Sequence, residues 1–345
     1  MTVEEMYQKL KRMLHDVVPD VELHYKAELA VEINRLKAEK NAVILGHNYM
    51  EPVLYHSVCD YMGDSLELSR KAAAATQDII IFCGVKFMAE TAKILNPGKT
   101  ILLPAQEAGC SLADSITAAD VRELKKRFPG VPVVTYVNTY ADVKAESDIC
   151  CTSGNAVAVV NSLDAQTIIF LPDEYLAGNV ARETGKHIIF PRLDLAAPPA
   201  YSPLDYQMIG WRGRCEVHEK FTVEDIEAVR LQFPDVAILA HPECSPAVVD
   251  ASDFSGSTAA MIRYIETSQA PRYLLLTECS MGENIAAANP HKNMLRLCSV
   301  RCPHMNRITL EGVLDSLKNN RYIIEVPEDI RQRASRAVER MIAIG

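Results

Sequence analysis

Three of the ten cysteines in this 345-residue chain stand in the same short pattern. Cys110, Cys215 and Cys302 are each followed by an apolar residue six positions later and by a threonine seven positions later. The other seven cysteines lack that pair of followers: Cys59, Cys83, Cys150, Cys151, Cys244, Cys279 and Cys298. If each patterned cysteine holds one equivalent place in a repeated unit, and the units surround a common axis, their thiols meet at one point. Three thiols at one point predict a metal site.

The spacing of the three cysteines indicates which kind of metal site this is. A single cysteine is often only a small buried hydrophobe, which is the structural alternative for each of the three. A structural zinc site would usually have four ligands, often in close CxxC pairs. Here three ligands lie about ninety residues apart, which favours a 4Fe–4S cluster with three irons held by thiolates and the fourth left open. An open iron can act as a Lewis acid toward a substrate oxygen.

Apolar runs at regular intervals predict the elements that position these cysteines. Three runs rich in valine and isoleucine, 42–49, 131–139 and 236–244, end in polar residues and are typical of buried parallel strands. Each leads to a turn of small residues that opens a helix: Gly63-Asp64-Ser65, Thr152-Ser153-Gly154 and Gly256-Ser257-Thr258. A second apolar run, a second helix and a third run (ILLPA, HIIFP or MLRL) lead toward the cysteine. This order predicts an α/β fold of three pseudo-threefold-related, three-layer αβα units with short parallel sheets around a central iron–sulfur cluster.

The repeat also predicts how the chain is divided. The expected segments are N-terminal helices at 1–40, a first unit at 41–130, a second at 131–235, and a third with a C-terminal tail at 236–345. A stretch rich in proline and alanine, about 191–206, is interpreted as an insertion in the second unit. The threonine of each motif is expected to begin a closing helix, because Thr117 and Thr222 have an aspartate three positions on.

Polar residues at the ends of the predicted central strands would face one cavity. They are His47, Asn48, Tyr49, Tyr136, Asn138, His241 and Glu243, and His218 follows Cys215 by three positions. Each alone could be an ordinary hydrogen-bonding residue, but together they supply groups suited to acid–base chemistry. The three small-residue turns place helix N-termini on the same face, which cap the helices and also favour bound anions. A substrate with carboxylates and a phosphate is therefore expected, with Lys86 as a further positive charge.

Composition excludes several classes of partner. The net charge of −9 and the pI near 5.6 argue against binding to nucleic acid or to an anionic membrane surface. The charged first eighteen residues are typical of an amphipathic helix rather than a signal peptide. No apolar run is long enough to span a bilayer. Ten cysteines without a secretory signal indicate a reducing compartment, so we expect a cytoplasmic protein.

The ordered motifs along nearly the whole chain resemble one known family. They are GHNY, GDSLELS, CGVKFMAETAKIL, GC-x-LAD, YVNT, CTSGNAV, GRC-x-VHE-x-FT, HPEC, GST and C-x-x-M-x-x-ITL. This set resembles the quinolinate synthase family. The resemblance implies three pseudo-threefold α/β domains around a 4Fe–4S cluster. It also implies condensation of iminoaspartate with dihydroxyacetone phosphate to quinolinate, with loss of phosphate and water, as a step of de novo NAD biosynthesis. An aspartate-oxidising enzyme would supply the unstable iminoaspartate.

The resemblance also implies a role for each matching residue. The cluster ligands would be Cys110, Cys215 and Cys302, the three that the repeat selects. The acid–base residues would be Tyr49 and Glu243, assisted by His47, His218 and His241. Carboxylates and phosphate would be held by Ser65, Tyr136, Asn138, Ser153, Ser257 and Thr258, with Met88 shaping the wall. The chain departs from shorter family members by the 191–206 insertion and by Cys298, a rival for the third ligand that lacks the repeat context.

Two other functions use the same three thiols. A non-catalytic iron or redox sensor would need no polar constellation at the strand ends, and this chain has one. A structural zinc protein would be colourless, whereas an iron–sulfur protein purified without oxygen is brown. The sequence therefore favours an enzyme of the dehydrating type.

Overall fold

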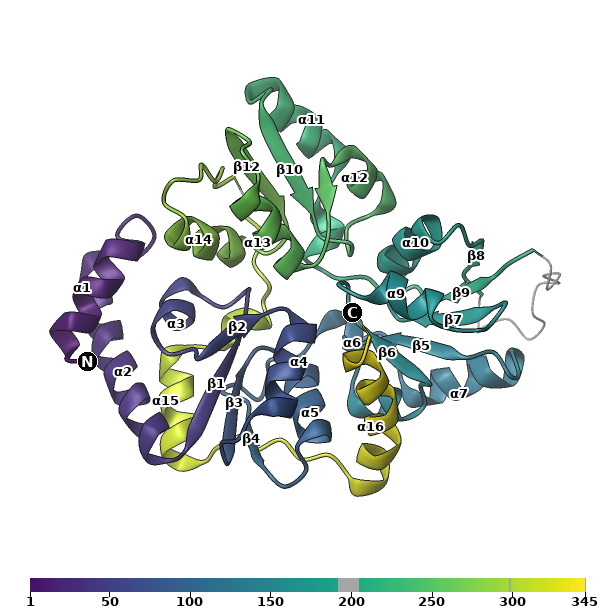
Figure 1. Ribbon diagram of the computed structural model, residues 1–345, viewed down its shortest axis with the longest axis horizontal. Coiled ribbons are helices and arrows are strands. Elements are labelled where there is room, and N and C mark those ends of the chain that lie inside the picture. The colour runs from purple at the N-terminus through teal and green to yellow at the C-terminus, as the bar shows by residue number, and fades with distance from the viewer. Residues whose placement is uncertain (192–204, 298, 345) are drawn as a thin grey trace.

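The computed structural model describes residues 1–191, 205–297 and 299–344. These residues form three parallel sheets. Figure 1 shows each sheet with helices packed beside it and the three units arranged around a common centre. The predicted α/β fold of three units with short parallel sheets is therefore confirmed. Most of the predicted insertion, 192–204, lies outside the described residues.

The first unit has the strand order β2-β1-β3-β4. Its elements are β1 (Ala42–His47), α3 (Pro52–Ser57), β2 (Tyr61–Gly63), α4 (Ser65–Ala74), β3 (Ile79–Cys83), α5 (Lys86–Leu95), β4 (Thr100–Leu102) and α6 (Ser111–Asp114). The central strand β1 is buried at every position, as its continuous apolar sequence requires.

The second and third units repeat this plan. The second, ordered β6-β5-β7-β9-β8, contains β5 (Val133–Tyr136), α8 (Ala141–Ala145), β6 (Ile149–Cys151), α9 (Ala156–Asn161), β7 (Ile168–Leu171), α10 (Glu174–Glu183), β8 (Ile188–Ile189), β9 (Met208–Gly210) and η1 (His218–Lys220). The third, ordered β11-β10-β12, contains β10 (Val236–Ala240), α12 (Pro246–Ala251), β11 (Phe254–Ser255), α13 (Thr258–Thr267), β12 (Arg272–Leu276), α14 (Cys279–Ala288) and η2 (Met305–Arg307).

The predicted third run of each unit forms the strand beside the second strand only in the first unit, where ILLPA begins with Ile101 and Leu102 of β4. In the second unit the strand next to β7 is β9, and HIIFP supplies only the edge strand β8. The burial of the two strands agrees with this order, because the inner strand β9 is fully buried whereas the edge strand β8 is half-buried. In the third unit MLRL forms no strand within the described residues; Met294 makes one isolated bridge to Tyr273, and Leu297 is 52% exposed.

A repeated hydrogen bond gives the register of the three units. The side chain of Asp60 accepts from the backbone N–H of Ile44 at 2.8 Å, that of Asp148 from Val133 at 2.7 Å, and that of Asp253 from Ile238 at 2.8 Å. In each case the residue after the aspartate pairs with the next residue of the central strand, which is Leu45, Val134 or Leu239. The three units therefore superimpose position by position, and equivalent residues can be named.

The closing helices begin where the motif threonines predict, but each packs on the next unit. They are α7 (Ala118–Arg127), α11 (Val223–Gln232) and α15 (Leu310–Asn319), each capped by its threonine; the first two have the full capping box. Val121 of α7 shares a core with the second sheet, and Ile226 of α11 shares one with the third. Helix α15 returns to the first unit and packs against α2 and β3. Each repeated cysteine therefore lies in a crossover between two units.

The two ends of the chain add helices outside the repeat. The predicted N-terminal helices are α1 (Val3–Leu14) and α2 (Asp20–Glu39). The last helix, α16 (Glu328–Ile342), packs against α5, α8 and β6 and so joins the first unit to the second. Arg70 of α4 donates to the backbone carbonyl of Ile342, and Asn155 donates to that of Met341. Figure 1 shows this end of the chain close to the centre of the molecule.

Candidate active site and metal centre

One central cavity collects nearly all of the residues that the sequence selects. Its lining includes Cys110, Cys215, Cys302, His47, Tyr49, His218, His241, Glu243, Ser65, Met88, Tyr136, Asn138, Ser153 and Thr258. Ser257 is absent from that lining, and so is Lys86, which contacts Glu90 and the ring of Tyr140 instead.

The register of the sheets shows that the cavity is built from equivalent positions. His47, Tyr136 and His241 occupy one position at the strand ends, two residues after the paired residues Leu45, Val134 and Leu239. Tyr49, Asn138 and Glu243 occupy the position two residues further on. All six face the same cavity because the carboxyl ends of parallel strands lie at one edge of each sheet. The threefold plan therefore places different chemical groups at matching places.

The same register separates the cavity hydroxyls from the helix caps. Ser65, Ser153 and Thr258 are equivalent, and all three line the cavity. The position before them holds Asp64, Thr152 or Ser257. Asp64 caps α4, and the hydroxyl of Ser257 accepts from the backbone N–H of Ala260 to cap α13. The predicted turn at Thr152 departs from this pattern because α9 begins only at Ala156.

Each repeated cysteine stands before a short helical turn with the same hydrogen bonds. The carbonyl of each accepts from the N–H four residues on: Asp114 at 2.9 Å, Glu219 at 3.0 Å and Asn306 at 3.1 Å. Burial raises the pKa of all three thiols, that of Cys302 to about 11. Hydrogen bonds from the backbone N–H groups two and three residues after each cysteine act in the opposite direction and lower the thiol pKa. Three thiols therefore each face two N–H donors of the kind that stabilise a metal-bound thiolate.

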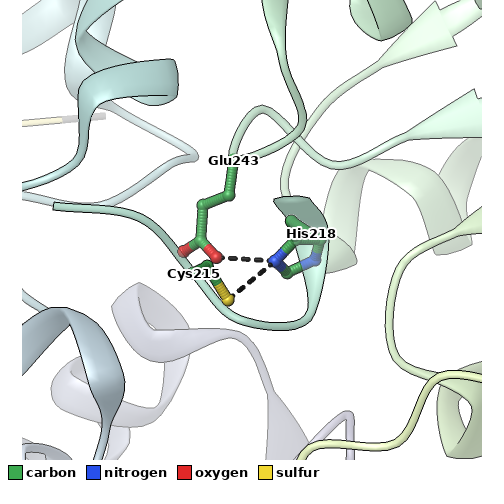
Figure 2. A group of neighbouring side chains, drawn as sticks. All are labelled: Cys215, His218 and Glu243. Carbon is green, nitrogen blue, oxygen red and sulfur yellow. Dashed lines mark hydrogen bonds and ion pairs between the residues drawn. The ribbon is translucent and has the colours of Figure 1, made fainter. Parts of the chain in front are cut away.

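A chain of hydrogen bonds runs from Tyr49 to Glu243. The hydroxyl oxygen of Tyr49 lies 2.5 Å from that of Thr277, which lies 2.9 Å from Nε2 of His218. Nδ1 of His218 lies 2.7 Å from Oε2 of Glu243 and 3.1 Å from Sγ of Cys215, as Figure 2 shows. Both neighbours of Nδ1 are acceptors when ionised, so we infer that Nδ1 carries the proton and that Nε2 accepts from Thr277. The order of groups is that of a hydroxyl–imidazole–carboxylate triad.

Glu243 of the third unit contacts several polar side chains of the second unit. Tyr136 donates to its Oε1, and Nδ2 of Asn138 lies 3.2 Å from the same oxygen. Burial alone would raise the pKa of Glu243. The neighbouring His218 and His241, with the hydrogen bonds from His218 and Tyr136, hold it well below its usual range. A carboxylate is therefore kept ionised inside a buried cavity.

Cys215, His218 and Glu243 could also hold a single metal ion, because their ligand atoms lie within 4.8 Å of one another. This arrangement would leave Cys110 and Cys302 without a role. It would also interrupt the hydrogen bond between His218 and Glu243. A centre that uses all three equivalent thiols fits the repeat better.

Comparisons with known proteins agree with this site. Residues 31–343 match the family model described as quinolinate synthetase A protein. The chain is 51% identical over 339 residues to quinolinate synthase 2 of Mesorhizobium japonicum, covering 98% of this chain and 97% of that protein. It is 50% identical over 337 residues to the quinolinate synthase of Sinorhizobium fredii, covering 98% and 87%, and 52% identical over 312 residues to that of Xylella fastidiosa, covering 90% and 86%.

The chain belongs to the quinolinate synthase family. No helix in the described part of this family member is both long and apolar enough to cross a membrane. The rival third ligand, Cys298, lies outside the described residues, whereas Cys302 lines the cavity.

Burial shifts the pKa values of several ionisable groups in the cavity of this family member. Burial lowers the pKa of His47 to about 4 and that of His241 to about 3, against the opposing charge of Glu243. Nδ1 of each accepts the backbone N–H two residues on, from Tyr49 at 3.2 Å or Glu243 at 3.3 Å. Burial and the charge of Glu243 raise the pKa of Tyr49 well above its ordinary value. Near neutral pH the cavity therefore holds neutral imidazoles at His47 and His241, a protonated phenol at Tyr49 and an ionised carboxylate at Glu243.

Replacing His47 by glutamine is expected to flatten the pH dependence of stability. Burial lowers the folded pKa of His47 to about 4, whereas an unfolded histidine titrates at about 6.5. Between these values only the unfolded chain takes up this proton, so stability present above about pH 6.5 is lost as the pH falls toward 4. From about pH 7 to 5, the free energy of unfolding in urea should fall by about 2 kcal/mol more in the wild type than in the variant. Parallel curves would contradict this.

Sequence reasoning missed several residues of the site. Thr277 follows β12 and links Tyr49 to His218, but the sequence predicts polar ends that face the cavity only for the first strand of each unit. A polar residue after the second apolar run, as in YLLLTEC, was the available signal. The other missed lining residues that can form hydrogen bonds through their side chains are Asp64, Ser111, Glu216 and His304.

Proposed function

We propose that this protein condenses iminoaspartate with dihydroxyacetone phosphate to quinolinate, with loss of phosphate and water. The observation that supports this most is that every residue to which the family resemblance assigns a role, except Ser257, lines one cavity. In this proposal the reaction is a step of de novo NAD biosynthesis in the cytoplasm, and an aspartate-oxidising enzyme supplies the first substrate. The acidic composition fits small-molecule substrates without a nucleic-acid or membrane partner.

Cys110, Cys215 and Cys302 would hold a 4Fe–4S cluster. The donor set fits, because three equivalent thiols line one cavity and each faces backbone N–H groups of its own turn. When bound, the cluster would supply an iron without a protein ligand, which can act as a Lewis acid toward a hydroxyl or carboxylate oxygen.

Tyr49 would move the protons of the reaction. Its raised pKa keeps the phenol protonated at rest, so it needs a partner to give up its proton. Thr277 can accept the phenol proton while it passes its own to Nε2 of His218. The imidazolium that forms is stabilised by Glu243 at 2.7 Å. The four residues, all of them buried, would thus prepare a phenolate in the cavity.

Neutral donors would hold the anionic groups of the substrates. The hydroxyls of Ser65, Ser153 and Thr258 hold equivalent positions in the cavity. Ser65 and Thr258 begin α4 and α13, where N–H groups and the helix dipole favour carboxylate or phosphate. His241 Nε2 lies 3.2 Å from the hydroxyl of Ser153, and Asn48 donates to that of Thr258 at 2.8 Å. Tyr136 and Asn138 would orient the substrates from the second unit, and Met88 would form part of the wall. The segments 1–40, 41–130, 131–235 and 236–345 are proposed as the units of sequence, although the closing helices pack across these boundaries.

Anaerobic purification followed by iron and sulfide analysis tests this function, with a quinolinate assay on the same sample. We expect a brown protein with four irons and four sulfides per chain, as the proposed cluster requires. Quinolinate should form only when both substrates are present. A colourless zinc protein, or a cluster-loaded protein that forms no quinolinate, would overturn the proposal.

Replacing Ser153 by alanine is expected to raise KM by about tenfold with little change in Tm. The variant loses a hydrogen bond from the hydroxyl of Ser153 to a carboxylate or phosphate of the substrate. A hydrogen bond to a charged group is worth about 1.5 kcal/mol. Ser257→Ala is the matched control, because Ser257 caps α13 and lies outside the cavity lining. It should lower the free energy of unfolding by about 1 kcal/mol and leave KM unchanged. The reverse pattern would show that the two roles are exchanged.

A further inference from the structure

The three cysteine loops contact one another through the residues beside the proposed ligands. The backbone N–H of Glu216 donates to the hydroxyl of Ser111 at 3.3 Å, which joins the second loop to the first. Nε2 of His304 lies 3.0 Å from Oε1 of Glu216, which joins the third loop to the second. We call Ser111, Glu216 and His304 the clasp. All three line the central cavity.

The contact closes into a ring at Gly109. A Cβ atom at this glycine would lie 3.5 Å from Nδ1 of His304 and 3.5 Å from the hydroxyl oxygen of Tyr140. His304 therefore packs beside the residue before Cys110, and the third loop meets the first. Each loop meets the other two within two residues of its cysteine. Contacts arranged in such a ring would oppose separation of the three loops.

The ring lies on the outer side of the cavity. The side chains of His304 and Glu216 are 26% and 35% exposed, whereas those of His218 and Glu243 are 2% and 4% exposed. Arginines just before two of the cysteines anchor the same loops to their own units. Arg214 donates to Glu174 at 2.9 Å, and Arg301 donates to Glu283 at 2.6 Å. The clasp is thus the cross-unit contact between anchored loops, on the side nearest to solvent.

We propose that the contact between Glu216 and His304 holds the second and third ligand loops together and thereby limits loss of the cluster. This inference rests on the proposed function, because it takes Cys110, Cys215 and Cys302 as cluster ligands. A cluster held by three loops from three crossovers can leave, or meet an oxidant from solvent, only when the loops separate. Separation of the second and third loops breaks the Glu216–His304 contact. Both residues are positioning residues, since each acts through the neighbouring cysteine.

The test measures how fast the anaerobically loaded protein loses its cluster. The variants are Glu216→Ala, His304→Ala and the double variant, with Glu216→Met as a volume-conserving form should truncation harm folding. The probe is decay of the visible cluster absorption in air with an iron chelator. His24→Ala is the matched control, because Nδ1 of His24 lies 3.4 Å from Glu28 in an exposed pair on α2.

Each single variant is expected to lose its cluster at least about threefold faster than the wild type, because each breaks a partly exposed ion pair. The double variant should be no faster than the faster single variant, because both remove one contact. The control should match the wild type. Unchanged rates, or effects that multiply in the double variant, would overturn the clasp. A wild type that binds no iron or sulfide would instead overturn the proposed function.

Discussion

Replacing Cys302 by alanine is expected to abolish cluster binding and quinolinate formation together. Two remaining thiolates would leave two irons of the cluster without protein ligands, and such a cluster is not retained. Cys110→Ala and Cys215→Ala should behave in the same way, because the three residues are equivalent. The measurement is iron and sulfide per chain after anaerobic reconstitution, with the visible spectrum of the same sample.

Cys59→Ala is the matched control for these variants. Cys59 is a free thiol of intermediate burial, like the three proposed ligands, but it is absent from the cavity lining. It should retain full iron and sulfide. Cys298→Ala separates the two candidates for the third ligand and should also keep the cluster. Loss of the cluster in Cys298→Ala with retention in Cys302→Ala would show that the repeat selects the wrong residue.

Replacing Tyr49 by phenylalanine is expected to lower kcat by about a hundredfold to ten-thousandfold while the cluster stays bound. The variant removes one proton-transferring group, and general acid–base catalysis contributes an effect of this size. Thr277→Val should act in the same direction because it interrupts the path from Tyr49 to His218, whereas Thr277→Ser should restore most of the rate. Steady-state kinetics on cluster-loaded enzyme measures both.

Tyr55→Phe is the control for Tyr49. The hydroxyl of Tyr55 donates to Asn48 at 3.3 Å, near the cavity but outside its lining. Its removal should change kcat by less than about fivefold, since one neutral hydrogen bond is worth about 1 kcal/mol. Equal effects in the two tyrosine variants would show that Tyr49 has no special role in proton transfer.

The sequence predicts the parts of the site that repeat. Cys110, Cys215 and Cys302 stand out because one pattern surrounds all three, and His47 and His241 because both end an apolar run. A buried parallel strand leaves a continuous apolar signal, so β1, β5 and β10 are found with ends accurate to a few residues. These features depend on local sequence alone.

The features that depend on packing between units escaped prediction. Thr277 acquires its role from Tyr49 and His218, which lie far away in the chain. Ser257 and Thr258 are neighbours of similar chemistry, and only the register of the sheets tells the cap from the cavity residue. Strand β9 lies beside β7 and is buried, whereas β8 is the half-buried edge strand, and the apolar run HIIFP gives no sign of this order. The closing helices have ordinary caps, and nothing in those caps says which sheet they cover.

Because each closing helix packs on the next unit, the three units depend on one another for their folded structure. A fragment that contains one sheet and the rest of its unit would lack the closing helix that comes from the preceding unit. It would therefore expose an apolar face of the sheet. Unfolding of one unit would likewise remove the closing helix that packs on the following unit. The molecule should therefore unfold as a single cooperative block in spite of its size, and its three sheets should share one transition in calorimetry.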